Sequence, residues 1–536
     1  MVLHAPLLRA QLLQVEWLQT IKGDQYEQIS ATAVAPCGDV YIAGFYQGSF
    51  SAYTATSAED AFVAKYSEDG QLKWLRNVSG SSTNRFNDIA IGNDNEIYLI
   101  GEFKGTIYNN SDSVTSQNQL DMLLTKMDSS GTIQWLNSGA GIGYESGNSI
   151  SIASNGSLMI TGYFEQGFRI DSLLLLAIGL RDVFVGSVDP LDGHIQWLSS
   201  FGGPAIEQAR SIHCDESNNC YLTGSFRDAL FIGGDTVLSK GNYDVFLAKF
   251  DEIGQMSWIK TFGGFSVDEG ACVKVDLNQD IYVAGWFNRS IFVDTVFVIG
   301  GQEDNAMLIK FNSDGALLWF KDIGQNFDER AYAIDFDIQN NVYLIGTLDS
   351  FMVLGQDTFQ NRHVSRPTDI FLAKYNEAGA LFWARDMGYH YNDFCYDLNV
   401  QNEQTIYTVG SFQDSTIFMG DSLTSEGGTY DIFVAKFGVD TTLSLSKNTD
   451  VSPSLIQTFP NPSQDEWHLS YQLRQDAQVE IRLVHHNGRS HQLLPKVFQS
   501  AGRYQFNFSK ATFFPGLYYI QLVINQKCYS IKHIFI

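Results

Sequence analysis

The stretch that decides the fold lies near the middle of the chain, where residues 271–287 read ACVKVDLNQDIYVAGWF and residues 304–324 read DNAMLIKFNSDGALLWFKDIG. Apolar side chains alternate with polar ones on both sides of each turn, which indicates β-strands with one buried face. Asn or Asp opens each turn and Gly closes the second one, as is typical of hairpins. The sequence therefore predicts a unit of four antiparallel strands.

Three features of this unit recur about every 60 residues along the chain. A tryptophan stands at Trp17, Trp74, Trp135, Trp197, Trp258, Trp319 and Trp383. A Tyr-x-x-Gly strand ends at Gly44, Gly101, Gly224, Gly285, Gly346 and Gly410, and LMITG ends at Gly162 without the tyrosine. An Asp-x-Phe-like strand opens at Asp60, Asp121, Asp182, Asp244, Asn305, Asp369 and Asp431. Seven four-stranded units of this size predict a seven-bladed β-propeller.

The order of the strands predicts how the ring closes. The chain opens on a tryptophan strand at residues 14–20 and ends its repeats on an Asp-x-Phe strand at residues 431–437. These two strands are hairpin neighbours in the complete units, so we expect the N-terminus to supply the last strand of the seventh blade. Such a closure leaves no bare sheet edge. The predicted fold is therefore all-β, with a seven-bladed β-propeller over residues 12–437.

The patterns D-x-F-x-x-K, G-x-x-x-W and Y-x-x-G resemble the SBBP repeats of bacterial β-propeller proteins. The resemblance covers residues 12–437 and is specific for the fold. It implies no catalytic motif.

The C-terminal part has a different pattern. Residues 438–454 are rich in Ser, Thr and Asp and read as a linker. Residues 455–536 contain alternating strands and are expected to form a small β-sandwich. The spacing of Pro460-Asn461-Pro462, V-x-I-x-L, N-G-R and Pro515-Gly516-Leu517-Tyr518 is similar to a type A sorting domain of the type IX secretion system. That resemblance implies export by the type IX machinery through residues 455–536, to the outer-membrane surface or the medium.

Charge and hydropathy exclude several classes of partner. The net charge of −26 disfavours nucleic acids and anionic membrane surfaces. The sequence shows no apolar run long enough to predict a transmembrane segment. Residues 1–11 are apolar but lack a basic start and a cleavage site, so we read them as a leader or a truncated signal rather than a convincing signal peptide.

A column of acidic residues precedes the first strand of the units, and it is the main candidate ligand site. Its members are Glu27, Glu145, Glu207, Asp268, Glu329 and Asp393, with Asn84 in the remaining unit. If the first strands are innermost, these carboxylates would ring one mouth of the channel and could hold a cation, attract a basic ligand or act in acid–base chemistry. The alternative is that each one caps a local turn by accepting backbone N–H groups.

Other candidate residues stand outside that column. Arg362, His363 and Arg366 form a basic spot in the one notable insertion, residues 359–367. Trp286 is a candidate sugar-binding aromatic or a packing variant.

Two kinds of covalent modification are also candidates. Cys214 and Cys220 flank a short turn, and facing strands could bring them within disulfide distance. Asp-Ser/Thr-apolar tripeptides read as turns, but the family resemblance also implies O-linked sugars at Ser113, Ser172, Thr236, Thr295, Thr358 and Ser422.

Two functions follow from these observations. The first is a secreted or cell-surface binding module that recognises an extracellular glycan or protein through loops on one face, because function in propellers resides in such loops. The second is a polysaccharide-acting hydrolase or lyase that uses the channel-mouth carboxylates. The chain lacks H-E-x-x-H, G-x-S-x-G, P-loop and C-x-x-C motifs. No cofactor is expected, with calcium left open, and a structural role in an extracellular layer stays an alternative.

Overall fold

The computed structural model describes residues 12–535 apart from several segments, namely 93, 110–111, 325–326, 350, 355–356, 361–367, 389–390, 426–429, 441–456, 460–465, 474–476, 486–489, 501, 510–515 and 525–526. The chain divides into two compact units. Val15–Phe437 is one, and Gly438–Ile536 together with Met1–Gln14 is the other. In the part of the chain that the structure describes, no helix is long and apolar enough to cross a membrane.

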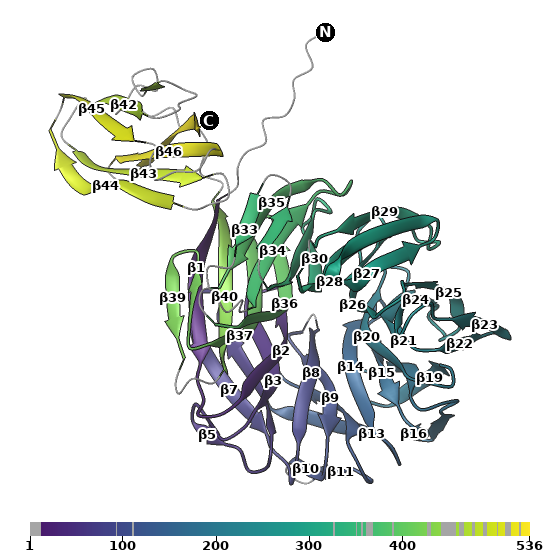
Figure 1. The fold of residues 1–536 in the computed structure, drawn as a ribbon. Coiled ribbons are helices and arrows are strands. Elements are labelled where there is room, and N and C mark those ends of the chain that lie inside the picture. The colour runs from purple at the N-terminus through teal and green to yellow at the C-terminus, as the bar shows by residue number, and fades with distance from the viewer. Residues whose placement is uncertain are drawn as a thin grey trace. The chain divides into compact units, whose positions relative to one another are not determined.

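Small antiparallel sheets with one recurrent strand order make up the larger unit (Figure 1). The first strands are β2 (Glu27–Val34), β8 (Asn84–Ile91), β14 (Glu145–Ile152), β20 (Glu207–Cys214), β26 (Asp268–Val275), β30 (Glu329–Phe336) and β36 (Asp393–Asn402). The second strands are β3 (Val40–Tyr46), β9 (Ile97–Phe103), β15 (Leu158–Phe164), β21 (Cys220–Phe226), β27 (Ile281–Val293), β31 (Val342–Leu348) and β37 (Thr405–Gln413).

The other two strands of each sheet follow the same order. The third strands are β6 (Asp60–Tyr66), β12 (Asp121–Met127), β18 (Asp182–Val188), β24 (Asp244–Phe250), β28 (Val296–Phe311), β34 (Asp369–Tyr375) and β40 (Tyr430–Asp440). The fourth strands are β7 (Leu72–Val78), β13 (Ile133–Gly141), β19 (Ile195–Phe201), β25 (Met256–Phe262), β29 (Leu317–Asp322), β35 (Leu381–Met387) and β1 (Leu12–Ile21), which lies next to β40.

A close approach between the first two strands of each sheet explains the glycine that ends the Tyr-x-x-Gly pattern. The register between β26 and β27 shifts between Gly270 and Cys272, which indicates a β-bulge opposite Gly285. A Cβ atom on Gly285 would lie 2.0 Å from the backbone oxygen of Glu269. Only glycine fits there without moving the bulge.

A short hairpin between the second and third strands was not predicted. The hairpins are β4 (Ser49–Phe50) with β5 (Tyr53–Thr54), β10 (Thr106–Asn109) with β11 (Asp112–Thr115), β16 (Gly167–Ile170) with β17 (Leu173–Leu176), β22 (Ala229–Ile232) with β23 (Asp235–Leu238), β32 (Phe351–Leu354) with β33 (Asp357–Gln360), and β38 (Ser415–Phe418) with β39 (Asp421–Thr424). Between β27 and β28 the hairpin is continuous with the two strands. Several hairpins bridge to the preceding sheet, as Phe231 does to Gly202.

The first strands lie side by side around the middle of this unit (Figure 1). Each contacts the first strand of the next sheet, and β36 contacts β2. The described residues are therefore all-β, and their repeated antiparallel sheets are consistent with a β-propeller built from repeats.

The C-terminal unit contains two small antiparallel sheets. One has the order β41 (Gln457–Phe459), β42 (Glu466–Leu473) and β45 (Gly502–Ser509), and the other has the order β44 (Ser490–Gln499), β43 (Ala477–His485), β46 (Gly516–Ile524) and β47 (Lys527–Phe535). Trp467, Tyr471, Ile481 and Leu522 belong to one buried core between them. Pro460-Asn461-Pro462 and Pro515 lie outside the described residues.

Candidate functional site

The lysine, tyrosine and tryptophan of the repeated motifs form a packing cluster rather than a ligand site. In the sheet of β26–β29, the Lys310 ammonium lies 4.9 Å from the ring centre of Tyr282, which packs edge-on against Trp319. Lys310 is 2% exposed and pairs with Asp280 at 2.8 Å. In the sheet of β14, β15, β18 and β19, Met159 and Ser187 face each other at the positions that correspond to Tyr282 and Lys310. This sheet therefore lacks both partners of the cation–π pair.

The tryptophans also join neighbouring sheets. The Trp258 ring packs against Gly315 in the turn of the next sheet, and Gly315 has a φ of +79°. The indole N–H of Trp74 donates to the Ser129 carbonyl, and that of Trp17 donates to the Glu68 carbonyl at 2.9 Å. These contacts explain why the three motif series repeat in register.

The six acidic residues of the predicted ring are buried, each at most 1% exposed, and none lines the central cavity described below. Four of them lie instead beside an aspartate near the start of the third strand of the preceding sheet: Glu27 beside Asp431, Glu145 beside Asp121, Glu207 beside Asp182 and Asp268 beside Asp244. Asn84 takes the same place, with its Nδ2 3.4 Å from Asp60 Oδ1. Backbone N–H groups of nearby turns donate to some of them: Gly203 donates to Glu207 at 2.7 Å. This geometry matches the turn-capping alternative, and ligand binding by these carboxyls stays a prediction.

Burial sets the protonation of these carboxyls. It raises the pKa of Glu27, Glu207 and Asp268 to about 8. Burial, followed by the negative charge of Asp121, raises the pKa of Glu145 to about 9. Ionising both of two neighbouring buried carboxyls costs much free energy. The carboxyl pairs between adjacent sheets therefore retain a proton at neutral pH.

A cavity of about 380 Å³ runs along the first strands. The side chains that line the cavity come from the bulge of each first strand and from the residues that follow it. Along this stretch, successive side chains point alternately toward the cavity and toward the core of the sheet. Among the lining side chains are Asp88, Arg210, His213, Lys274, Tyr332, Tyr396 and Asp397. Arg210 is 45% exposed at its side chain, so the cavity reaches the surface at the bulge end of the strands.

Some of the polar side chains of the cavity tie adjacent first strands together. Asp88 Oδ2 accepts the Ile150 N–H at 2.8 Å, and Ser211 Oγ accepts the Val273 N–H at 3.1 Å. Three more links of this kind are Ser149 to Ile212, Asp335 to Val400 and Asp397 to Thr32. Both carboxyl oxygens of Asp397 are occupied, because the Leu398 N–H also donates to it. These side chains replace sheet hydrogen bonds where first strands meet without pairing.

One wall of the cavity departs from the repeat. At the same position of four successive first strands stand His213, Lys274, Asp335 and Asn399, whereas the other three have Ala33, Ala90 and Ser151; all of these residues except Asp335 line the cavity. Burial lowers the pKa of Lys274, but the charges of Asp335, Asp397 and Asp88 outweigh it and raise the pKa. Burial, with the charge of Lys274, lowers the pKa of His213 to about 3, so its imidazole is neutral.

The Lys274 ammonium and one imidazole nitrogen face the cavity without a protein partner. Among the described residues, no carboxylate lies within ion-pair distance of the ammonium. His213 Nδ1 accepts the Val275 N–H at 3.3 Å, which places the imidazole proton on Nε2. Two groups of donors on adjacent strands are therefore available to a ligand.

Aromatic side chains gather at the open end of the cavity, and we call Phe45, Tyr26, Tyr430, Phe394, Tyr396, Tyr332 and Trp286 the aromatic arc. From Phe45 to Tyr396 each ring centre lies 5.9–6.4 Å from the next. The rings of Tyr332 and Trp286 are 5.9 Å apart. Tyr332 and Tyr396 also line the cavity, so the arc continues into it. Trp286 thus belongs to a surface cluster outside the repeated tryptophan series.

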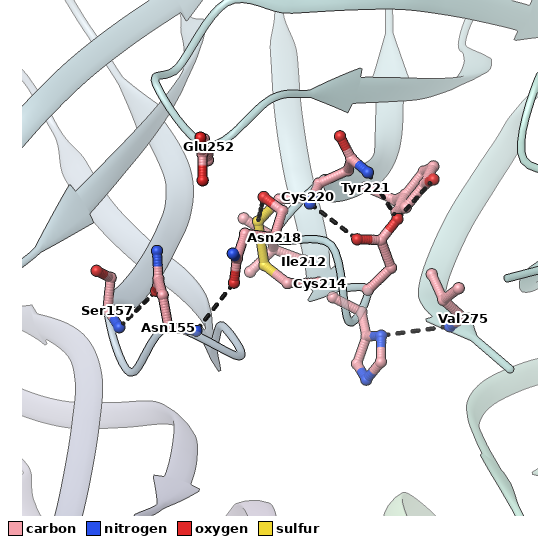
Figure 2. The surroundings of a disulfide bond; sticks show 12 residues. Asn155, Ser157, Ile212, Cys214, Asn218, Cys220, Tyr221, Glu252 and Val275 are labelled. Carbon is pink, nitrogen blue, oxygen red and sulfur yellow. Dashed lines mark hydrogen bonds between the residues drawn. A yellow bond between two sulfur atoms is a disulfide. The ribbon is translucent and has the colours of Figure 1, made fainter. Parts of the chain in front are cut away.

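The predicted cysteine pair is bonded in the structure. A disulfide joins Cys214 and Cys220, which face each other across β20 and β21 (Figure 2). In the turn between them, Asn218 Oδ1 accepts the N–H of Asn155 from the neighbouring sheet at 2.9 Å. Cys37, Cys272 and Cys395 are free thiols.

The candidate modification sites lie on the short hairpins, at the periphery of the unit. Ser113, Ser172, Thr236, Thr295 and Ser422 are exposed. The side chain of Thr358 and the basic spot of Arg362, His363 and Arg366 lie outside the described residues. Among the described residues, no group of three His, Cys, Asp or Glu side chains could hold a metal ion.

The sequence analysis singled out Trp286 but missed the other residues of the aromatic arc. It also missed His213, Lys274 and Asn399, which we call the polar wall of the cavity. These residues stand at positions where the residue type differs from one repeat unit to the next, whereas the sequence analysis relied on positions where the residue type stays the same. An alignment of the seven units would have placed His213, Lys274 and Asp335 in one column with Ala33, Ala90 and Ser151. The change from small to larger polar residues in this column is the feature of the sequence that could have indicated the cavity.

Comparison with known proteins gives a limited result. No protein-family model matches the chain. An uncharacterised WD repeat-containing protein of Acanthamoeba polyphaga mimivirus is 21% identical over an alignment of 475 residues, and the match covers 72% of this chain. The chain spans about a third of the length of that relative, 34%. The match fits a β-rich repeat protein that resembles WD-repeat proteins.

Similar solved structures include a fungal alcohol oxidase in complex with copper, which is 9% identical, covers 98% of this chain and 99% of its own, and has a TM-score of 0.40. Another is a crystal structure from Bacteroides vulgatus, 10% identical, covering 80% of this chain and 96% of its own, with a TM-score of 0.29. Similarity at these scores carries no argument about this chain.

Proposed function

We propose that this chain is a secreted or cell-surface binding module, built as a closed seven-bladed β-propeller of SBBP-type repeats and exported by the type IX system. One observation carries the binding function. The positions that pack sheets together repeat along the chain, whereas the positions that face the cavity carry His213, Lys274 and Asn399 in place of small side chains. A partly buried charge such as that of Lys274 costs free energy of desolvation, so packing alone does not account for it.

Several contacts support the closed ring. Asp397 of β36 accepts the Thr32 N–H of β2, and Asn399 Nδ2 donates to the Thr32 carbonyl at 3.0 Å. β1 lies beside β40, so an N-terminal strand completes the sheet that the end of the repeat region supplies. This arrangement leaves seven blades without a bare edge between the first and the last.

Binding is better supported than catalysis. A hydrolase or lyase that acts through carboxyl groups needs a carboxyl oxygen within reach of substrate. The carboxyls first suggested for this role are buried between sheets, and both oxygens of Asp397 in the cavity already accept backbone N–H groups. The cavity therefore offers hydrogen-bond donors and aromatic faces more than free carboxyl groups.

Export rests on the resemblance of residues 455–536 to a type A sorting domain, and their small two-sheet unit is compatible with it. The test is the location and intact mass of the mature protein in the source culture. We expect a protein outside the cell that lacks residues 455–536. A full-length protein in the cytoplasm would overturn the export proposal.

A further inference from the structure

We propose that the cavity and the aromatic arc bind a neutral saccharide. This inference rests on the proposed binding function and names the class of its ligand. It depends on three features of the described residues: paired charges at the cavity and beside the arc, aromatic rings of which most are partly exposed, and a wall of donors and acceptors within the cavity.

Arginines at the cavity and beside the aromatic arc already have carboxylate partners. Arg210, which lines the cavity, pairs with Glu269 at 2.9 Å. Arg330 lies over the Trp286 ring and pairs with Asp304 at 2.6 Å. Arg85 lies over the Phe45 ring and pairs with Glu102 at 3.1 Å. A strongly charged ligand would have to compete with these pairs, whereas an uncharged one leaves them intact.

Inside the cavity, the mixture of charges disfavours ligands of either sign. An anion that approached Lys274 would also meet Asp335 and Asp397, whose charges raise the pKa of that lysine. A cation that approached the carboxylates would meet Lys274 in turn. A ligand with hydroxyl groups avoids both costs, because each hydroxyl accepts from one neighbour and donates to another.

The positions of donors and acceptors suit such hydroxyls. The Lys274 ammonium and the His213 Nε2–H are donors on adjacent strands, and Asn399 lines the same wall. Small side chains at the equivalent positions of β2, β8 and β14 leave the opposite side of the cavity open. Its volume of about 380 Å³ lies at the lower end of the range for small-molecule sites.

The aromatic arc supplies the other half of saccharide recognition. A pyranose ring has an apolar face of C–H groups, which packs against aromatic rings, and a polar edge of hydroxyls. Tyr26 is 37% exposed, and Tyr332 and Tyr396 line the cavity from the same end. Aromatic rings bring contact area at low entropic cost and keep a polar tip for water or ligand. A sugar held by the arc would present its hydroxyls to the polar wall.

The repeat provides substitutions that the fold already tolerates. Tyr332→Ser introduces the residue that β2 has at the same position, Ser30, and Lys274→Ser introduces the Ser151 of β14. Tyr108→Ser is the matched control, because Tyr108 is 69% exposed on a peripheral hairpin. Circular dichroism and thermal unfolding check that each variant folds.

Calorimetric titration of the full chain tests the ligand class. The neutral probes are xylohexaose, mannohexaose, cellohexaose, laminarihexaose, maltohexaose and chitohexaose, and the charged probes are trigalacturonate and spermine. We expect a neutral probe to bind the wild type and Tyr108→Ser, with affinity at least about tenfold lower for Tyr332→Ser and Lys274→Ser, or about 1.4 kcal/mol. Binding of a charged probe alone, or neutral binding that neither variant weakens, would overturn the proposal.

A second assay separates failure of the saccharide inference from failure of the binding function. Purified protein is passed over extracellular matrix from the source culture, treated beforehand with periodate or with proteinase K. A saccharide ligand is supported, even if no probe binds, when periodate treatment of the matrix abolishes retention and proteinase K treatment does not. The Tyr332→Ser variant should then be retained more weakly than the wild type. Retention that only proteinase K abolishes overturns the saccharide but keeps the binding function. If untreated matrix retains no protein and no probe binds, both proposals fail.

Discussion

Replacement of Glu145 by glutamine tests whether the carboxyls buried between sheets carry a proton at neutral pH. Glu145 opens β14, is completely buried and lies beside Asp121 of the preceding sheet. Burial and the charge of Asp121 raise its pKa from 4.5 to about 9. An amide is already present at this position in β8, where Asn84 approaches Asp60. Glutamine is therefore expected to fit at position 145.

The size of the effect follows from proton linkage. The unfolded chain loses the Glu145 proton near pH 4.5, whereas the folded protein keeps it up to about pH 9. Between these values the folded state binds more protons, so the free energy of unfolding falls as the pH rises. At neutral pH this loss is about 1.4 kcal/mol for each of roughly 2.5 units, or about 3 kcal/mol. Glutamine carries no such cost, and we expect the variant to be more stable than the wild type by about 1–3 kcal/mol after losses in hydrogen bonding.

Guanidinium titration followed by tryptophan fluorescence measures this difference at about pH 5 and about pH 8. The variant should resemble the wild type at the lower pH and exceed it at the higher. Glu216→Gln, in the exposed turn between β20 and β21, is the control and should leave the pH dependence unchanged. If Glu145→Gln is less stable than the wild type by the same amount at both pH values, then Glu145 is ionised in the folded protein and the reasoning is refuted.

Three further changes test other parts of the fold. Met159→Tyr combined with Ser187→Lys restores the missing cation–π pair, and thermal unfolding of the single and double variants should reveal a favourable coupling of about 1 kcal/mol; additive effects would contradict the pairing. Cys214→Ala opens a disulfide with a sequence separation of 6 and should cost about 2 kcal/mol, while a reductant should destabilise only the wild type. Removal of residues 1–21 exposes the edge of β40 and deletes Trp17, so light scattering should detect self-association, whereas a monomer of unchanged stability would contradict ring closure.

Much of the larger unit could be predicted from the sequence because its packing contacts repeat. Trp258 meets the turn of the next sheet at Gly315, and the other tryptophans that stack on such turns do so in the same way. A contact that recurs at a fixed spacing imposes the same residue type at that spacing, so the repeat can be recognised in the sequence. The peripheral hairpins escaped prediction because strands such as β10 and β23 have only four residues, too few for alternation to stand out.

The candidate site was harder to predict, for a reason of geometry. The acidic column was recognised, and the first strands are adjacent to one another as expected. A strand places successive side chains on opposite faces, however, and sequence alone does not say which face meets the axis. Glu145 and Glu207 point into the junction between sheets, whereas residues beyond the bulge, such as Asp88, line the cavity.

Some positions of the repeat unit keep the same residue type in each unit, and others vary. This difference between positions is more informative about function than any single residue. A side chain in the sheet core has the same neighbours in each unit, so the physics of packing demands the same residue type each time. A side chain at the axis faces water and small neighbours, and alanine or serine satisfies that position in three first strands. In other first strands, His213 and Asp335 offset part of their desolvation cost by accepting the N–H groups of Val275 and Val400, whereas the Lys274 ammonium has no ion-pair partner among the described residues. Stability therefore does not explain Lys274, and the proposed recognition of a ligand does.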